Sequence, residues 1–157
     1  MSETELRKIE KLLNEYGESH QNTTNKKIHW FAVPLIYLTV VGFIWSIPNI
    51  PILEINWVWP ALILTLAYYY QLSKPLMLGM AGFTLICILL VSNYNLLDAP
   101  LNLVEICISI FVIAWVFQFV GHKIEGKKPS FMRDIQFLLI GPAWLMSFIM
   151  KKYNIKY

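Results

Sequence analysis

Three histidines, His20, His29 and His122, are the residues of this sequence best suited to metal chemistry. Imidazole is the commonest transition-metal ligand, and its pKa near 6.5 leaves a free lone pair at neutral pH. His20 and His29 lie nine residues apart, so on one continuous helix they would point in opposite directions. The intervening run Asn22-Thr23-Thr24-Asn25 is typical of a turn followed by a helix N-cap. We therefore predict a break there, with Asn25 as the cap of the next helix, so that both rings can face one point.

A second polar group surrounds His122. Gln118 lies four residues earlier and would share its helix face. Glu125 follows three residues later and would join the same site if the helix continued past Gly121. A carboxylate so close to hydrocarbon is costly unless it is paired or bound to a cation. These positions suggest a polar site at the end of an apolar helix.

Each of these residues also has a structural explanation. A single histidine at a membrane interface is more often structural than catalytic, and Gln118 would commonly form a hydrogen bond between helices. Lys127 and Lys128, which follow Glu125, would commonly meet anionic lipid headgroups. Composition and spacing alone leave both a shared metal site and a set of structural histidines open.

Several other chemistries are disfavoured by absent motifs. The sequence has no glycine-rich phosphate loop, no GxSxG, no HExxH and no CxxC. Its three histidines are too few for a histidine-box di-iron site. It has no extended basic stripe for nucleic acid, and no ionisable group near the middle of its long apolar runs, as a transporter would need. A membrane enzyme and a non-enzymatic membrane protein remain.

The elements that must position these side chains are membrane helices. Hydrophobic residues make up 57% of the 157 residues and charged residues 15%, against about 25% charged in soluble domains. A spanning helix needs about 20 apolar residues. We predict an all-α polytopic membrane helix bundle, in which four helices span the bilayer near Ile28–Ile47, Ile55–Leu72, Pro75–Val91 and Val104–Val120.

A fifth uncharged run, residues 135–150, is marginal as a span. Its 16 residues would cover about 24 Å as a helix, short of a hydrocarbon core about 30 Å thick. Gly141-Pro142 also interrupts it. The sequence therefore predicts either a kinked span or a re-entrant segment.

The distribution of Lys and Arg predicts the orientation. Lys and Arg occur in residues 1–27, at Lys74 and in residues 121–134, whereas the loops 48–54 and 92–103 contain no Lys or Arg. The positive-inside rule then places the N-terminus and the three histidines on the cytoplasmic side. This would be the inner membrane of a bacterium or the endoplasmic reticulum of a eukaryote. A re-entrant fifth segment would keep all 13 basic residues on that side.

The chain is expected to form a single membrane domain over residues 1–157. Residues 1–25 would be a cytoplasmic amphipathic helix and turn, 26–150 the bundle and 151–157 a basic tail. Ser2-x-x-Glu5 reads as a capping box, and an apolar residue recurs at helical spacing at Leu6, Ile9, Leu13 and Tyr16. We expect a helix over about 4–17, ended by Gly17, that acts as a lid or surface anchor or packs on its own domain.

Three stretches of the sequence resemble one known family. They are YGESHQNTTNKKIHWFAVPL (16–35), WVFQFVGHKIEGKKPSF (115–131) and LLIGPAW (138–144). They are similar to the small membrane proteins typified by the yeast endoplasmic-reticulum 2-hydroxy fatty acid dioxygenase. Here Glu125 follows His122 by three residues, whereas the family pattern has four. The resemblance implies an iron(II)-dependent α-oxidation that uses dioxygen and shortens a 2-hydroxy fatty acid by one carbon.

The resemblance also implies roles for individual residues. His20, His29 and His122 would bind Fe²⁺ and leave positions open for dioxygen and for the carboxylate and hydroxyl of the substrate. Around them, Asn25 and Gln118 are possible partners, and Glu125 would be a ligand, a group that orients an imidazole, or a helix cap. Lys127 or Lys128 would pair with the substrate carboxylate, and the acyl chain would lie among the helices in the lipid bilayer. The alternative is a non-enzymatic membrane scaffold or assembly factor with structural histidines.

Overall fold

The computed structural model describes residues 7–97, 99–128 and 136–157, and this part of the chain is all helical. It contains six α-helices, one short 3₁₀ helix and no strand, which confirms the all-α part of the predicted fold class. The elements are α1 (Lys8–Glu18), α2 (Thr23–Trp45), α3 (Val58–Leu72), α4 (Lys74–Ser92), η2 (Tyr94–Leu97), α5 (Leu103–Glu125) and α6 (Phe137–Lys152).

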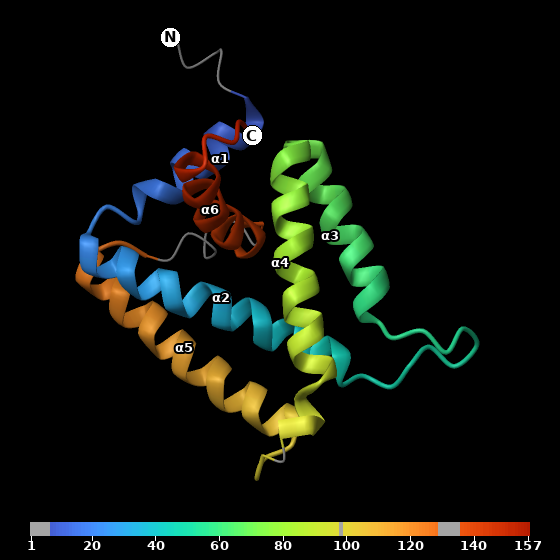
Figure 1. Cartoon of the computed structure of the whole chain (residues 1–157). Coiled ribbons are helices and arrows are strands. Elements are labelled where there is room, and N and C mark those ends of the chain that lie inside the picture. Colours follow the sequence, from blue (N-terminus) through green and yellow to red (C-terminus); the bar gives the residue numbers. More distant parts are fainter. Residues whose placement is uncertain (1–6, 98, 129–135) are drawn as a thin grey trace.

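Helices α2 and α5 lie side by side and form the longest packed pair of the fold (Figure 1). They approach most closely near both ends. A Cβ atom on Gly121 would collide with Oδ1 of Asn25, and one on Gly42 would collide with Sγ of Cys107. Small residues let two helix backbones come this close. Because Asn25 meets Gly121 while Gly42 meets Cys107, the two helices are antiparallel.

Helices α3 and α4 form a hairpin joined at Ser73 (Figure 1). The Ser73 hydroxyl caps α4 by accepting a hydrogen bond from the backbone N–H of Leu76 at 3.3 Å. Helix α4 packs against α2, and the two are linked by a 2.7 Å hydrogen bond between the Tyr37 hydroxyl and Oγ1 of Thr84. Buried Val41 and Val58 also pack together in this region, which ties the start of α3 to the second half of α2.

Helix α1 packs on α6 rather than standing apart as a lid. Its apolar face, including Ile9, Leu13 and Tyr16, is buried in one cluster with Ile140 and Trp144 of α6. The close approach depends on Gly141, because a Cβ there would lie 2.9 Å from the Tyr16 hydroxyl. Of the two expectations for the amphipathic helix, the structure shows packing on its own domain.

Within the part of the chain that the structure describes, three helices are long and apolar enough to cross a membrane: α2, α4 and α5. Large apolar side chains such as Leu89 on α4 and Val112 on α5 are more than half exposed, as lipid-facing residues would be. Helices α3 and α6, with 15 and 16 residues, would cover only about 22 and 24 Å. The fourth predicted span and the path of the fifth segment remain predictions.

The start of α2 differs from the prediction. Its N-cap is Asn22, whose side chain accepts hydrogen bonds from the backbone N–H groups of Thr24 at 2.8 Å and Asn25 at 3.3 Å. The prediction that Asn25 is the cap was wrong, because the Asn-Thr-Thr-Asn run offers two asparagines and the earlier one starts the helix. Asn25 lies fully buried inside the first turn, where its side chain is free for other contacts.

Other helix ends also differ from the sequence-based boundaries. Helix α1 continues through Gly17 to Glu18, and its described N-cap is Arg7, paired with Glu10. The predicted Ser2–Glu5 capping box lies outside the described residues. Helix α5 continues past Gly121 to Glu125 and ends at Gly126, whose φ of 73° suits glycine. Helix α6 is continuous through Gly141-Pro142.

Candidate metal centre

His20 lies in the short connection between α1 and α2 and is fully buried. Its Nδ1 atom is 2.6 Å from the backbone carbonyl oxygen of Tyr16. The Tyr16 ring stacks on the imidazole, with ring centroids 4.2 Å apart and an interplanar angle of 12°. The indole of Trp144 from α6 lies on the same ring at 5.2 Å between centroids. Helices α1 and α6 thus hold this imidazole in one orientation.

His29 lies near the start of α2 and His122 near the end of α5, and these two helix ends are adjacent in the antiparallel pair. His29 lies in the second turn of α2 and is fully buried, with Nδ1 3.0 Å from the carbonyl oxygen of Asn25. His122 lies in the last turn of α5 and is 5% exposed. Because α2 and α5 are antiparallel, the start of one helix faces the end of the other, and the two histidines face each other.

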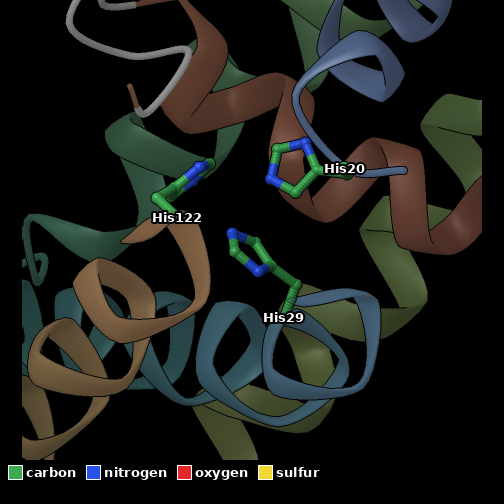
Figure 2. Close-up of side chains that lie close together, drawn as sticks. All are labelled: His20, His29 and His122. Carbon is green, nitrogen blue, oxygen red and sulfur yellow. The ribbon is translucent and has the colours of Figure 1, made fainter. Parts of the chain in front are cut away.

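The structure brings all three imidazoles together at one point (Figure 2). Ring centroids are 4.3 Å apart for His20 and His29, and 4.9 Å apart for each of the two pairs with His122. One nitrogen from each ring lies within 4.8 Å of the others. The predicted convergence of residues more than 90 positions apart is therefore present in the fold.

Three buried ring nitrogens in this cluster have no hydrogen-bond partner among the described residues: Nε2 of His20, Nε2 of His29 and Nδ1 of His122. A carbonyl oxygen can only accept, so Nδ1 of His20 and of His29 must carry the proton. Their Nε2 atoms are then left with lone pairs and no donor. Imidazoles that bind metals commonly donate their other N–H to a backbone carbonyl in this way.

The donor set fits a first-row transition metal. Imidazole suits iron, zinc, copper and nickel, and three neutral imidazoles leave coordination positions open. Metal–nitrogen bonds of about 2.1 Å keep ligand nitrogens within about 4.2 Å of each other, so a separation near 4.8 Å would close by roughly 0.6 Å on binding. A buried polar atom without a partner costs free energy, and a metal would remove that cost for all three.

Burial also keeps His20 in the form that binds metals. Removal of water around the ring lowers the pKa of His20 from 6.5 to about 4, against a smaller raising effect of its contact with the Tyr16 carbonyl. Charging a buried imidazole is unfavourable because the protein interior solvates charge poorly. The ring is therefore neutral at physiological pH, with its Nε2 lone pair available.

Glu125 lies next to the cluster and holds its two halves together. One carboxylate oxygen accepts a hydrogen bond from the backbone N–H of Gln21 at 2.8 Å. The other accepts from the backbone N–H of Asn22 at 2.9 Å and from Nδ2 of Asn25 at 3.0 Å. The last turn of α5 is thereby fastened to the connection that carries His20. Among the described residues, the grouped metal-ligand atoms are those of the histidines alone, without this carboxylate.

The chain matches one known protein family over most of its length. A family model described as 2-hydroxy-palmitic acid dioxygenase Mpo1-like matches residues 6–153. The chain belongs to the Mpo1-like family. The matched region contains all three histidines and every described helix, which confirms the family resemblance of the sequence. Comparisons with curated proteins and with solved structures gave no match.

The other predicted site residues of this Mpo1-like chain lie at different distances from the imidazoles. Gln118 is buried one turn before His122 and lines an apolar cavity with it. The Lys127 ammonium donates a 2.6 Å hydrogen bond to the carbonyl oxygen of Glu18, at the end of α1. Lys128 is exposed. Pairing of Lys127 or Lys128 with a substrate carboxylate stays a prediction.

Two contributors to the centre were not assigned a role from the sequence. Tyr16 was placed only in the apolar face of the first helix, yet it supplies both the stacked ring and the carbonyl that orient His20. Trp144 had no predicted role and packs on the same imidazole. Both residues fall in stretches shared with the Mpo1-like family, and that is the signal that would have singled them out.

Proposed function

We propose that this protein binds Fe²⁺ through His20, His29 and His122 and uses dioxygen to shorten 2-hydroxy fatty acids by one carbon. Two observations carry the proposal: each histidine has one buried ring nitrogen without a hydrogen-bond partner among the described residues, and ligand nitrogens from the three rings lie within 4.8 Å of one another. The family description, a 2-hydroxy-palmitic acid dioxygenase, supports the use of dioxygen and the substrate class.

The protein's own residues would position and shield the metal. The carbonyls of Tyr16 and Asn25 hold two imidazoles in the tautomer that presents Nε2. Tyr16 and Trp144 pack against the imidazole of His20, which is fully buried from water. Bound iron would supply open positions for dioxygen and for the carboxylate and hydroxyl oxygens of the substrate.

The overall reaction needs no further reductant. One 2-hydroxy acid and one dioxygen balance to a fatty acid shorter by one carbon, carbon dioxide and water. The bond between C1 and C2 breaks, C2 becomes the new carboxyl carbon, and four electrons pass from the hydroxy acid to dioxygen. Because no reductant is consumed, the site needs no place for one beside the metal ligands.

The position of the centre suits a lipid substrate. The histidines lie where α2 begins and α5 ends, so a polar head could reach them from the membrane interface while its tail stayed among the helices. By the positive-inside rule, this interface would be the cytoplasmic one. The protein would therefore act on hydroxy acids held in the membrane leaflet.

The direct test is oxygen uptake by protein purified without oxygen and loaded with Fe²⁺. With 2-hydroxypalmitate we expect uptake together with a fifteen-carbon acid, measured by an oxygen electrode and by mass spectrometry. His122→Ala should lower the rate at least about 100-fold, because loss of one ligand weakens binding and opens the site. Equal rates for both proteins would contradict the proposal.

Metal analysis separates the proposal from its alternative. A non-enzymatic scaffold with structural histidines predicts that alanine at all three positions keeps full function in cells and that the purified protein holds no stoichiometric metal. We expect about one iron per chain for the natural sequence and almost none for the triple variant. Stoichiometric zinc, with no activity after iron loading, would contradict the assignment of iron.

A further inference from the structure

An apolar cavity of about 520 Å³ begins at the histidine cluster and runs between the helices. Tyr16 and His122 line one end. Along α2 its lining extends from Val33 to Ile44, which corresponds to about 16 Å of helix. Val58, at the start of α3, lines the end farthest from the histidines. The cavity is therefore long, and only one of its ends touches a candidate metal ligand.

The wall of the cavity offers little to a polar occupant. Where α2 meets α4, the Tyr37 hydroxyl and the Thr84 hydroxyl bond to each other at 2.7 Å, and Thr84 also donates to the Met80 carbonyl at 2.8 Å. These hydroxyls are satisfied within the wall. Elsewhere the lining is dominated by Val, Ile, Leu and Phe side chains, with Gln118 near the histidine end and Thr65, Trp115 and Gln136 as the other side chains with polar atoms. An apolar cavity of this kind does not hold stable water.

One side of the cavity opens towards the apolar surface. Val40 of α2 and Leu138 of α6 line it and are also 41% and 44% exposed. Both helices contribute apolar residues there, and α2 is long enough to cross a bilayer. An aliphatic chain could therefore enter from the membrane without passing through water.

We propose that this cavity is the acyl-chain site of the enzyme, with the substrate head at His122 and the chain end at Val58 and Ala61 of α3. This inference deepens the proposed function and rests on it for the identity of the head group. Val58 is buried and Ala61 lines the same end of the cavity. These two side chains close the cavity and set the longest chain that fits.

The test uses Ala61→Phe, which fills the far end, and Ala67→Phe as its matched control. Ala67 lies on the same helix but is exposed and does not line the cavity. The probe is palmitic acid with a diazirine on its terminal carbon, crosslinked by light to metal-free protein in lipid nanodiscs and mapped by mass spectrometry. We expect labels near Ile44 and Val58, a loss of at least ten-fold in Ala61→Phe, and no change in Ala67→Phe.

A second measurement uses turnover. Each methylene excluded from an apolar site should lower kcat/KM about four-fold. Ala61→Phe should therefore shift the preference among 2-hydroxy acids of ten to eighteen carbons towards the shorter ones. Val58→Ala, which enlarges the same end, should shift it towards longer ones, and it tests the proposal even if Ala61→Phe does not fold.

The outcomes distinguish this inference from the proposed function. Labels spread over exposed residues such as Leu89, or equal labelling of both phenylalanine variants, would overturn the acyl-chain site. Oxygen uptake without labelling of the cavity would leave the dioxygenase standing and reject the site. Labelling of the cavity without oxygen uptake would support the site and reject the dioxygenase.

Discussion

Two backbone carbonyls control which imidazole nitrogens are available in the candidate metal centre. Tyr16 and Asn25 each precede the histidine they orient by four residues, and each carbonyl oxygen accepts a hydrogen bond from the protonated Nδ1 of that histidine. His122 is oriented differently, since its own Nδ1 is the unpartnered atom. The unpartnered atom is thus Nε2 in His20 and His29 but Nδ1 in His122.

Glu125 is predicted to tune metal affinity without binding the metal. Glu125→Gln replaces a carboxylate that accepts three N–H groups with a neutral amide that accepts more weakly and adds a donor facing those groups. The connection carrying His20 would then loosen. We expect iron affinity to fall about 10- to 100-fold, measured by competition with a chelator.

Glu105→Gln is the matched control for this substitution. Glu105 is on the same helix, at its other end, where its carboxylate accepts the Asn102 N–H at 2.9 Å in a capping box. Its loss should cost a similar small amount of helix stability and leave metal affinity unchanged. Equal affinities for both variants would show that Glu125 only caps the turn.

The antiparallel packing of α2 and α5 brings His29 and His122 together in the candidate metal centre. Its register sets Asn25 against Gly121, which in turn places His29 opposite His122. The side chain of Asn25 lies against the Gly121 backbone and also donates to the Ser19 carbonyl at 3.2 Å. Any residue larger than glycine at position 121 would push the two helices apart next to the imidazole cluster.

Gly121→Ala should therefore destabilise the protein and the site together. The new Cβ would collide with Oδ1 of Asn25, and overpacking of this kind costs about 1–3 kcal/mol in the free energy of unfolding. Gly82→Ala is the control, because a Cβ there meets nothing within 4 Å on exposed α4. Its effect should be neutral or stabilising by up to about 1 kcal/mol. Thermal unfolding with and without iron checks both, and equal effects would contradict the packing argument.

At the level of the whole molecule, the basic groups of distant segments come together. Lys151 and Lys156 of the C-terminal region share one groove with Arg7 and Lys74. Figure 1 shows the start of α1, the end of α6, the C-terminus and the α3–α4 turn in the same part of the molecule. This arrangement favours the re-entrant interpretation of the fifth segment, in which the C-terminus stays with the other basic residues.

The topology prediction is that the C-terminus lies on the same side of the membrane as Lys74. Taking Lys151, Lys152 and Lys156 across the bilayer would oppose the positive-inside rule. In a background without Cys87 and Cys107, Tyr157→Cys and Lys74→Cys should react with an impermeant maleimide from one side. Leu96→Cys, in exposed η2, should react from the other. If Tyr157→Cys reacts together with Leu96→Cys, α6 crosses the membrane and the prediction is wrong.

Local patterns in the chain were enough to predict the helical class, the approximate helix positions, and the three histidines as a group. These features depend on the length of apolar runs and on residue chemistry, which are readable without a fold. The sequence could not decide whether Asn22 or Asn25 caps α2, because asparagine is favoured at a helix N-cap in either position. Only the tertiary structure decides three other features, because they depend on how α1, α2, α5 and α6 pack. These are the contact between His20 and Trp144, the hydrogen bonds of Glu125 to the α1–α2 connection and to Asn25, and the cavity beside His122.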